Sequence, residues 1–72
     1  MTPQQADAGR SVMRGTFKHK DVRRALQRAN VPIDQLEGAT NTLLQAEKEA
    51  GHIRYQKLDG QPADENDTWV KV

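Results

Sequence analysis

Apolar residues recur at helical spacing near the start of the chain. Thr2 and Gln5 stand three residues apart around Pro3, which is the pattern of a capping box with proline in the first helical turn. We therefore expect a helix that runs to about Arg14 and stops at Gly15. Its apolar stripe is thin, and the glycine within it indicates close packing; the stripe consists of Ala6, Gly9, Val12 and Met13.

A second helix is predicted from about His19 to Ala29, after a short extended connector at Thr16 and Phe17. Its apolar residues follow the spacing i, i+3, i+4 and i+7, so they form one face; they are Val22, Ala25, Leu26 and Ala29. The sequence 30–32 ends this helix, because its proline lacks an amide donor and holds the preceding residue extended.

A third helix is predicted from about Ile33 to Ala50, with Gly51 as its C-terminal stop. One face of this helix is expected to enter the core, through Ile33, Leu36, Ala39, Leu43, Leu44 and Ala46. The later part of the chain then changes from helical spacing to alternation, which indicates strands.

Residues 52–58 alternate polar and apolar side chains as far as Tyr55, so they predict a strand. The polar stretch 61–67 has no apolar residue large enough to anchor it and is expected to form a mobile tip, and 68–72 form the closing strand of a hairpin. The predicted core joins helices and strands, and contains Leu26, Leu43, Leu44, Ile53 and Val70, with Phe17, Tyr55 and Trp69 as its aromatic members.

A chain of 72 residues supports one small core, so 1–72 are expected to form a single domain that gains stability as a homodimer. No apolar run approaches the roughly 20 residues of a membrane span, and the N-terminus lacks the pattern of a signal peptide. The absence of cysteine excludes disulfides, thiolate metal sites and a cysteine nucleophile. These features predict a cytoplasmic protein with no membrane partner.

Positive charge is concentrated in one part of the chain. Residues 10–30 hold seven bases and one acid, a net charge of +6, whereas the other residues hold four bases and nine acids, a net charge of −5. The net charge of +1 is therefore the sum of a basic segment and an acidic remainder, so the molecule is dipolar. The basic segment is suited to an anionic partner.

The order of elements resembles that of the winged helix-turn-helix family of small bacterial and phage regulators. The resemblance rests on Phe17 ahead of the helix at 21–26, on the break at 30–32, and on the leucines, glycine and isoleucine of 43–53. It implies an α+β fold in which three helices are followed by a two-stranded antiparallel wing. It also implies a regulator of a phage or mobile element that binds duplex DNA as a homodimer.

In that family the third helix enters the major groove, and the second helix and the wing contact the backbone. The resemblance assigns base contacts to Gln35, Thr40 and Asn41, whose side chains both donate and accept hydrogen bonds. It assigns phosphate contacts to the bases of the second helix and its approach: Lys18, Lys20, Arg23, Arg24 and Arg28.

Acidic residues depart from the family pattern in two places. Asp34 and Glu37 lie in the first turns of the third helix, where phosphates would repel them. The tip of the wing holds four acids and no base: Asp59, Asp64, Glu65 and Asp67. A different class of function therefore stays open, in which the acidic wing or third helix of a protein-interaction module holds a basic partner.

Side chains suited to catalysis or metal binding are scattered. His19 and His52 belong to different predicted elements, and no cysteine or paired carboxylate motif accompanies them. This is typical of surface or capping histidines rather than of metal ligands. Ser11, the only serine, lacks a nucleophile motif, and Glu47 and Glu49 are interpreted as solvated side chains. We therefore expect no enzymatic activity and no cofactor.

Overall fold

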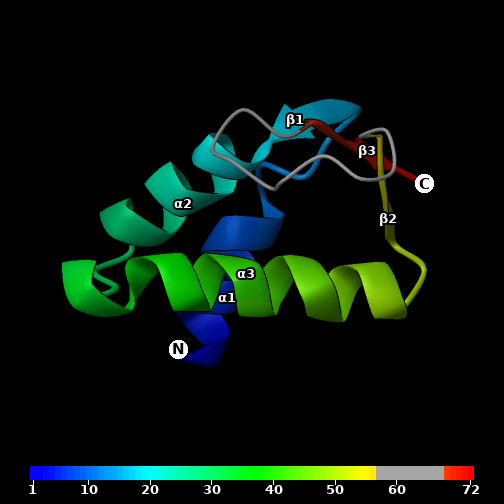
Figure 1. The fold of residues 1–72 in the computed structure, drawn as a ribbon. Coiled ribbons are helices and arrows are strands. Elements are labelled where there is room, and N and C mark those ends of the chain that lie inside the picture. Colours follow the sequence, from blue (N-terminus) through cyan, green and yellow to red (C-terminus); the bar gives the residue numbers. More distant parts are fainter. Residues whose placement is uncertain (57–67) are drawn as a thin grey trace.

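The computed structural model describes residues 1–56 and 68–72, and there the chain forms three helices and a three-stranded antiparallel sheet (Figure 1). The elements follow the order α1 (Pro3–Arg10), β1 (Thr16–Lys18), α2 (His19–Arg28), α3 (Ile33–Glu49), β2 (Ile53–Tyr55) and β3 (Thr68–Lys71). The predicted tip at 61–67, with its acidic residues, lies outside the described part of the chain. No helix among the described residues is long and apolar enough to cross a membrane.

The start of α1 confirms the predicted capping box. The amide of Gln5 donates to Thr2 Oγ1 at 3.1 Å, and the amide of Thr2 donates to Gln5 Oε1 at 2.9 Å. The predicted end at Arg14 is wrong, because the helix ends at Arg10. The amides of Val12 and Met13 bond to carbonyls three residues back instead of four, which tightens the turn, and the Met13 side chain lies in the core.

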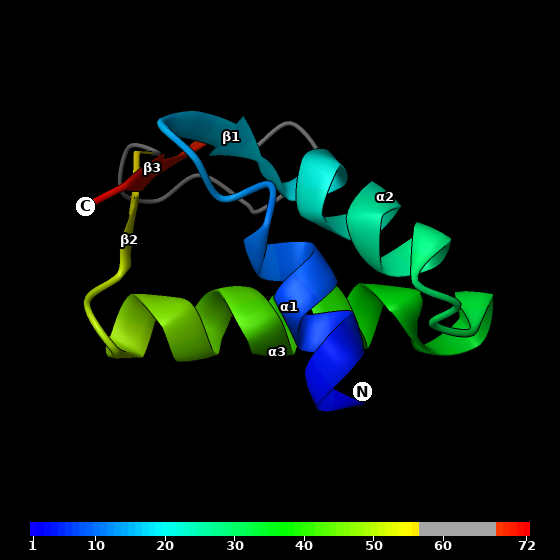
Figure 2. The same ribbon diagram turned by 180° about the vertical axis from the view of Figure 1, so that it is seen from behind.

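Gly9 lets α1 pack directly on the other two helices, as the sequence predicted. A Cβ at this position would lie 3.1 Å from Leu26 Cδ2 and closer still to Leu43 Cδ2. Figure 2 shows α1 crossing α3, with α2 alongside. A side chain at Gly9 would therefore push the helices apart.

A tight turn joins α2 to α3. Asn30 adopts φ 71°, a left-handed conformation that asparagine tolerates, and the buried Val31 follows it. The predicted bounds of both helices are confirmed to within one residue. Two predicted core positions are wrong: Ile33 is 80% exposed at the N-terminal end of α3, and Ala46 is exposed on its outer side.

The predicted two-stranded wing is in part wrong, because the extended connector forms β1 and enlarges the sheet to three strands. The order is β1-β3-β2, with both pairs antiparallel. Phe17 and Tyr55 both pair with Trp69, so these three residues share the inner face. The rings of Tyr55 and Trp69 lie 4.5 Å apart at an interplanar angle of 46°.

Four of the five residues predicted to meet in the core do so: Leu26, Leu43, Leu44 and Ile53. Val70 is the exception. It pairs with Thr16 and Arg54 and is half-buried, because strand alternation turns the neighbouring Trp69 inward.

Glu47 joins α1 to the end of α3, contrary to the expectation that it is solvated. Its carboxylate accepts from Arg10 Nε at 2.6 Å and lies 2.6 Å from His52 Nδ1, while the residue is 8% exposed. The hydrogen bond from Arg10 is the main reason that the pKa of Glu47 is lowered from its ordinary value. The bond from His52 acts in the same direction.

Candidate nucleic-acid interface

The outer side of α3 carries a stripe of small and uncharged polar residues. Gly38, Asn41, Thr42 and Gln45 follow the spacing i, i+3, i+4 and i+7, and all four are exposed. We refer to these four residues as the amide stripe. No described helix or strand covers the near side of α3 in Figure 1. A Cβ added at Gly38 would meet nothing within 4 Å, so the stripe offers open access to a partner.

The structure separates the three side chains predicted to contact bases. Asn41 is exposed within the amide stripe, and Gln35 is exposed one turn before Gly38. Thr40 is fully buried, and its hydroxyl donates to the carbonyl of Leu36 at 2.7 Å. A base contact by Thr40 is therefore wrong, because its position four residues after Leu36 places it on the core face of the helix.

Two further residues complete this surface, and the sequence analysis overlooked them. Thr42 and Gln45 flank Asn41 on the outer side of α3, where they line a shallow hollow together with Ala46 and Glu49. Gln45 Nε2 donates to Glu49 Oε1 at 3.0 Å. Their spacing relative to Gly38 is the signal that could have identified them.

The start of α2 lies beside Asn41. His19 Nε2 is 2.9 Å from Asn41 Oδ1. His19 was expected to be a surface or capping residue, but it is 7% exposed, because it shares one face of α2 with the buried Val22 and Leu26. This contact brings the first turn of α2, with Lys20 next to His19, to the edge of the amide stripe.

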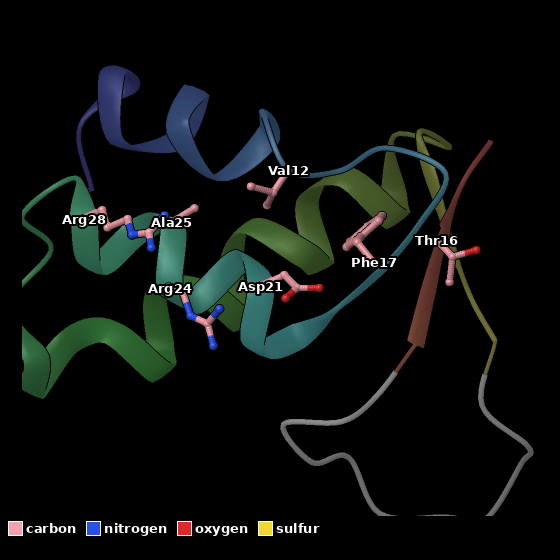
Figure 3. A pocket seen from close by; sticks show the side chains of 7 residues that line it. All are labelled: Val12, Thr16, Phe17, Asp21, Arg24, Ala25 and Arg28. Carbon is pink, nitrogen blue, oxygen red and sulfur yellow. The ribbon is translucent and has the colours of Figure 1, made fainter.

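The bases of α2 are divided between two sides of the helix. Arg23 shares a hollow with Glu37 of α3. Lys20 stands three residues before Arg23 and four before Arg24, so it lies between them on the surface of the helix. Arg24 and Arg28 lie on the other side of α2, along a groove of about 250 Å³ (Figure 3). The remaining lining residues of that groove are Val12, Thr16, Phe17, Asp21 and Ala25.

Lys18 has a third orientation. It alternates with the buried Phe17, so its side chain belongs with Thr16 on the outer face of the sheet, and its amide donates to Asp21 Oδ2 at 3.0 Å. The five predicted phosphate contacts thus do not share one face.

Charge varies along the outer side of α3. Asp34 and Glu37 are exposed near its N-terminal end, and Glu49 is exposed at its C-terminal end. Lys48 is also exposed and lies seven residues after Asn41, on the same side of the helix. The amide stripe is therefore an uncharged centre between an acidic N-terminal end and a C-terminal end of mixed charge.

No three histidine, cysteine, aspartate or glutamate side chains among the described residues come together as a metal site requires. His19 forms a hydrogen bond with Asn41, and His52 forms one with Glu47. No protein-family model, curated protein or solved structure matches this chain.

Proposed function

We propose that the chain is a winged helix-turn-helix protein that binds duplex DNA with α3 in the major groove. The observation that carries this proposal is the hydrogen bond between His19 and Asn41, which joins the first turn of α2 to the amide stripe. The tight turn between α2 and α3 and the strand order β1-β3-β2 are compatible with the same family.

The amide stripe has the chemistry that base edges require. A helix about 10–12 Å across fits the major groove, which is about 12 Å wide. Asn41, Thr42 and Gln45 present amides and a hydroxyl, which hydrogen-bond to base edges without attracting phosphate. Gly38 allows the helix backbone to approach the bases closely.

Phosphate contacts are proposed for the bases beside the stripe. Three bases would meet the strands that border the groove: Lys20, next to His19, Arg23, on the side of α2 that faces Glu37, and Lys48 on α3. Arg24 and Arg28 face another side, and Lys18 lies on the outer face of the sheet. These three would add long-range attraction rather than direct contacts.

A role as a dimeric transcriptional regulator of a phage or mobile element rests on the family resemblance alone. A second candidate function is a protein-interaction module that holds a basic partner. The observation that favours it is the exposure of Asp34 and Glu37 at the end of α3.

Fluorescence anisotropy with a labelled, short duplex of randomised sequence tests the proposal. Lys20→Gln is expected to weaken binding and to reduce the slope of log affinity against log salt by about 1, between about 50 and 200 mM salt. The matched control Arg28→Gln removes the same charge from the other side of α2 and is expected to change the slope less. Equal effects would contradict the proposed face, and no binding at low salt would favour the protein-interaction module.

A further inference from the structure

His19 is a buried polar residue whose partners restrict its ring to one arrangement. It is 7% exposed, and Nε2 lies 2.9 Å from Asn41 Oδ1. Nδ1 is also buried and has no hydrogen-bond partner among the described residues. A neutral imidazole carries one proton, so the position of that proton decides which ring nitrogen donates.

Both observations place the proton on Nε2. The Oδ1 atom of Asn41 is an acceptor, so a bond at 2.9 Å requires a donor on the ring. A proton on Nδ1 would be a buried donor without an acceptor, which is unfavourable. His19 therefore donates to Asn41 through Nε2.

This bond also sets the orientation of Asn41. Its Oδ1 atom is turned towards His19, and its Nδ2 amine has no partner among the residues that the structure describes. Because Asn41 is exposed in the amide stripe, the group that it offers to a partner is a donor with two hydrogens.

We propose that His19 is a positioning residue that makes Asn41 select guanine at the base pair it faces. This inference rests on the proposed function. Guanine presents two acceptors, N7 and O6, in the major groove, and both suit an NH2 donor. To bind adenine, an asparagine accepts from N6 through its side-chain carbonyl and donates to N7. In this chain that carbonyl already accepts from His19, so it is turned away from the base. Adenine N7 and thymine O4 each offer this donor a single acceptor, one fewer than guanine, and cytosine offers only a donor.

Selection of duplexes from a randomised pool tests the assignment. Four forms of the full chain are compared: the wild type, Asn41→Ala, His19→Gln and His19→Phe. The base pair that Asn41 faces is the one whose preference disappears in Asn41→Ala. At that pair the wild type is expected to prefer guanine by about 5- to 150-fold, the range for one good bidentate side-chain contact.

The two His19 variants separate positioning from packing. Glutamine carries its amide nitrogen four bonds from Cα, as Nε2 of histidine is, so His19→Gln keeps a donor for Asn41 and is expected to retain the guanine preference. His19→Phe keeps a ring but removes the donor, so the preference should shift towards adenine. Circular dichroism establishes that each variant is folded before selection.

Nitrogen-15 chemical shifts of the His19 ring provide a readout that needs no DNA. The protonated nitrogen in the free wild-type protein is expected to be Nε2, and a proton on Nδ1 would overturn the inference. It would also be overturned by an adenine preference in the wild type, by no preference that depends on Asn41, or by the same preference in the wild type and His19→Phe. These results leave DNA binding intact, whereas failure of the wild type to enrich any duplex overturns the proposed function and, with it, the guanine assignment.

Discussion

Replacement of Glu47 by glutamine tests how the buried carboxylate stabilises the fold. The substitution keeps the size of the side chain and removes its charge. In the native protein the two carboxylate oxygens bond to Arg10 Nε and His52 Nδ1, each at 2.6 Å. A glutamine can accept from Arg10 through Oε1, but its amide NH2 then faces His52 Nδ1, which loses its carboxylate partner and can accept only if the ring proton moves to Nε2.

The expected loss follows from these contacts. Hydrogen bonds to charged groups contribute about 1.5–3 kcal/mol each, and a neutral bond contributes about 1 kcal/mol. Both partners are partly exposed, with side chains 46% and 56% accessible, so water can solvate them after the change. We therefore expect Glu47→Gln to lower the free energy of unfolding by about 2 kcal/mol at neutral pH, which corresponds to about 8–16 °C in Tm for a domain of this size.

The effect should depend on pH with a defined sign. Because the pKa of Glu47 is lowered in the folded state, its stabilising contribution is present above the unfolded value of about 4.3 and is lost as pH falls through the folded pKa. The difference between the wild type and Glu47→Gln should therefore be full at neutral pH and should shrink below about pH 4.

Urea unfolding followed by the fluorescence of Trp69, the only tryptophan, measures this difference at several pH values. Glu49→Gln is the matched control, because it removes an exposed carboxylate from the same helix and should change stability by less than about 0.5 kcal/mol. A loss in Glu47→Gln no larger than in this control, or a loss that does not change with pH, would refute the reasoning.

Three other substitutions follow: two test the packing of the core, and one tests the charge of the proposed DNA interface. Leu43→Ala should lower the unfolding free energy by about 2–5 kcal/mol in urea titrations, and a loss below about 1 kcal/mol would contradict its core position. Gly9→Ala should lower Tm although alanine favours helices by about 1 kcal/mol, because its Cβ would press on Leu43 and Leu26; a raised Tm would contradict this. Asp34→Asn should strengthen binding to duplexes of any sequence in anisotropy titrations, and unchanged affinity would place Asp34 away from phosphate.

Signals confined to a few neighbouring residues were sufficient to predict the helices. The capping box of Thr2 and Gln5 and the stop at Gly51 depend on backbone groups within a turn, so the sequence alone reveals them. By contrast, β1 is only three residues long, and one apolar residue between two polar ones is too short a pattern to predict a strand. It is a strand because Phe17 pairs with Trp69, which lies far along the sequence.

Burial of polar residues was the main feature that the sequence concealed. Thr40, Glu47 and His19 are all polar and all buried, and each has a specific hydrogen-bond partner: the carbonyl of Leu36, the side chains of Arg10 and His52, and, for one ring nitrogen of His19, the side chain of Asn41. Such partners are known only once helices are placed against one another. The same placement divides the arginines of α2 between two sides, which charge counting along the chain does not reveal.

A nuclear magnetic resonance titration of the nitrogen-15-labelled chain with a short DNA duplex at low salt tests the proposed interface most directly. Binding through α3 predicts that the largest shifts of backbone amides fall at 38–45 and at the first turn of α2, with small changes at Val12, Thr16 and Arg28. Shifts centred on the groove beside Arg28, or no shifts at all, would contradict recognition of DNA by the amide stripe.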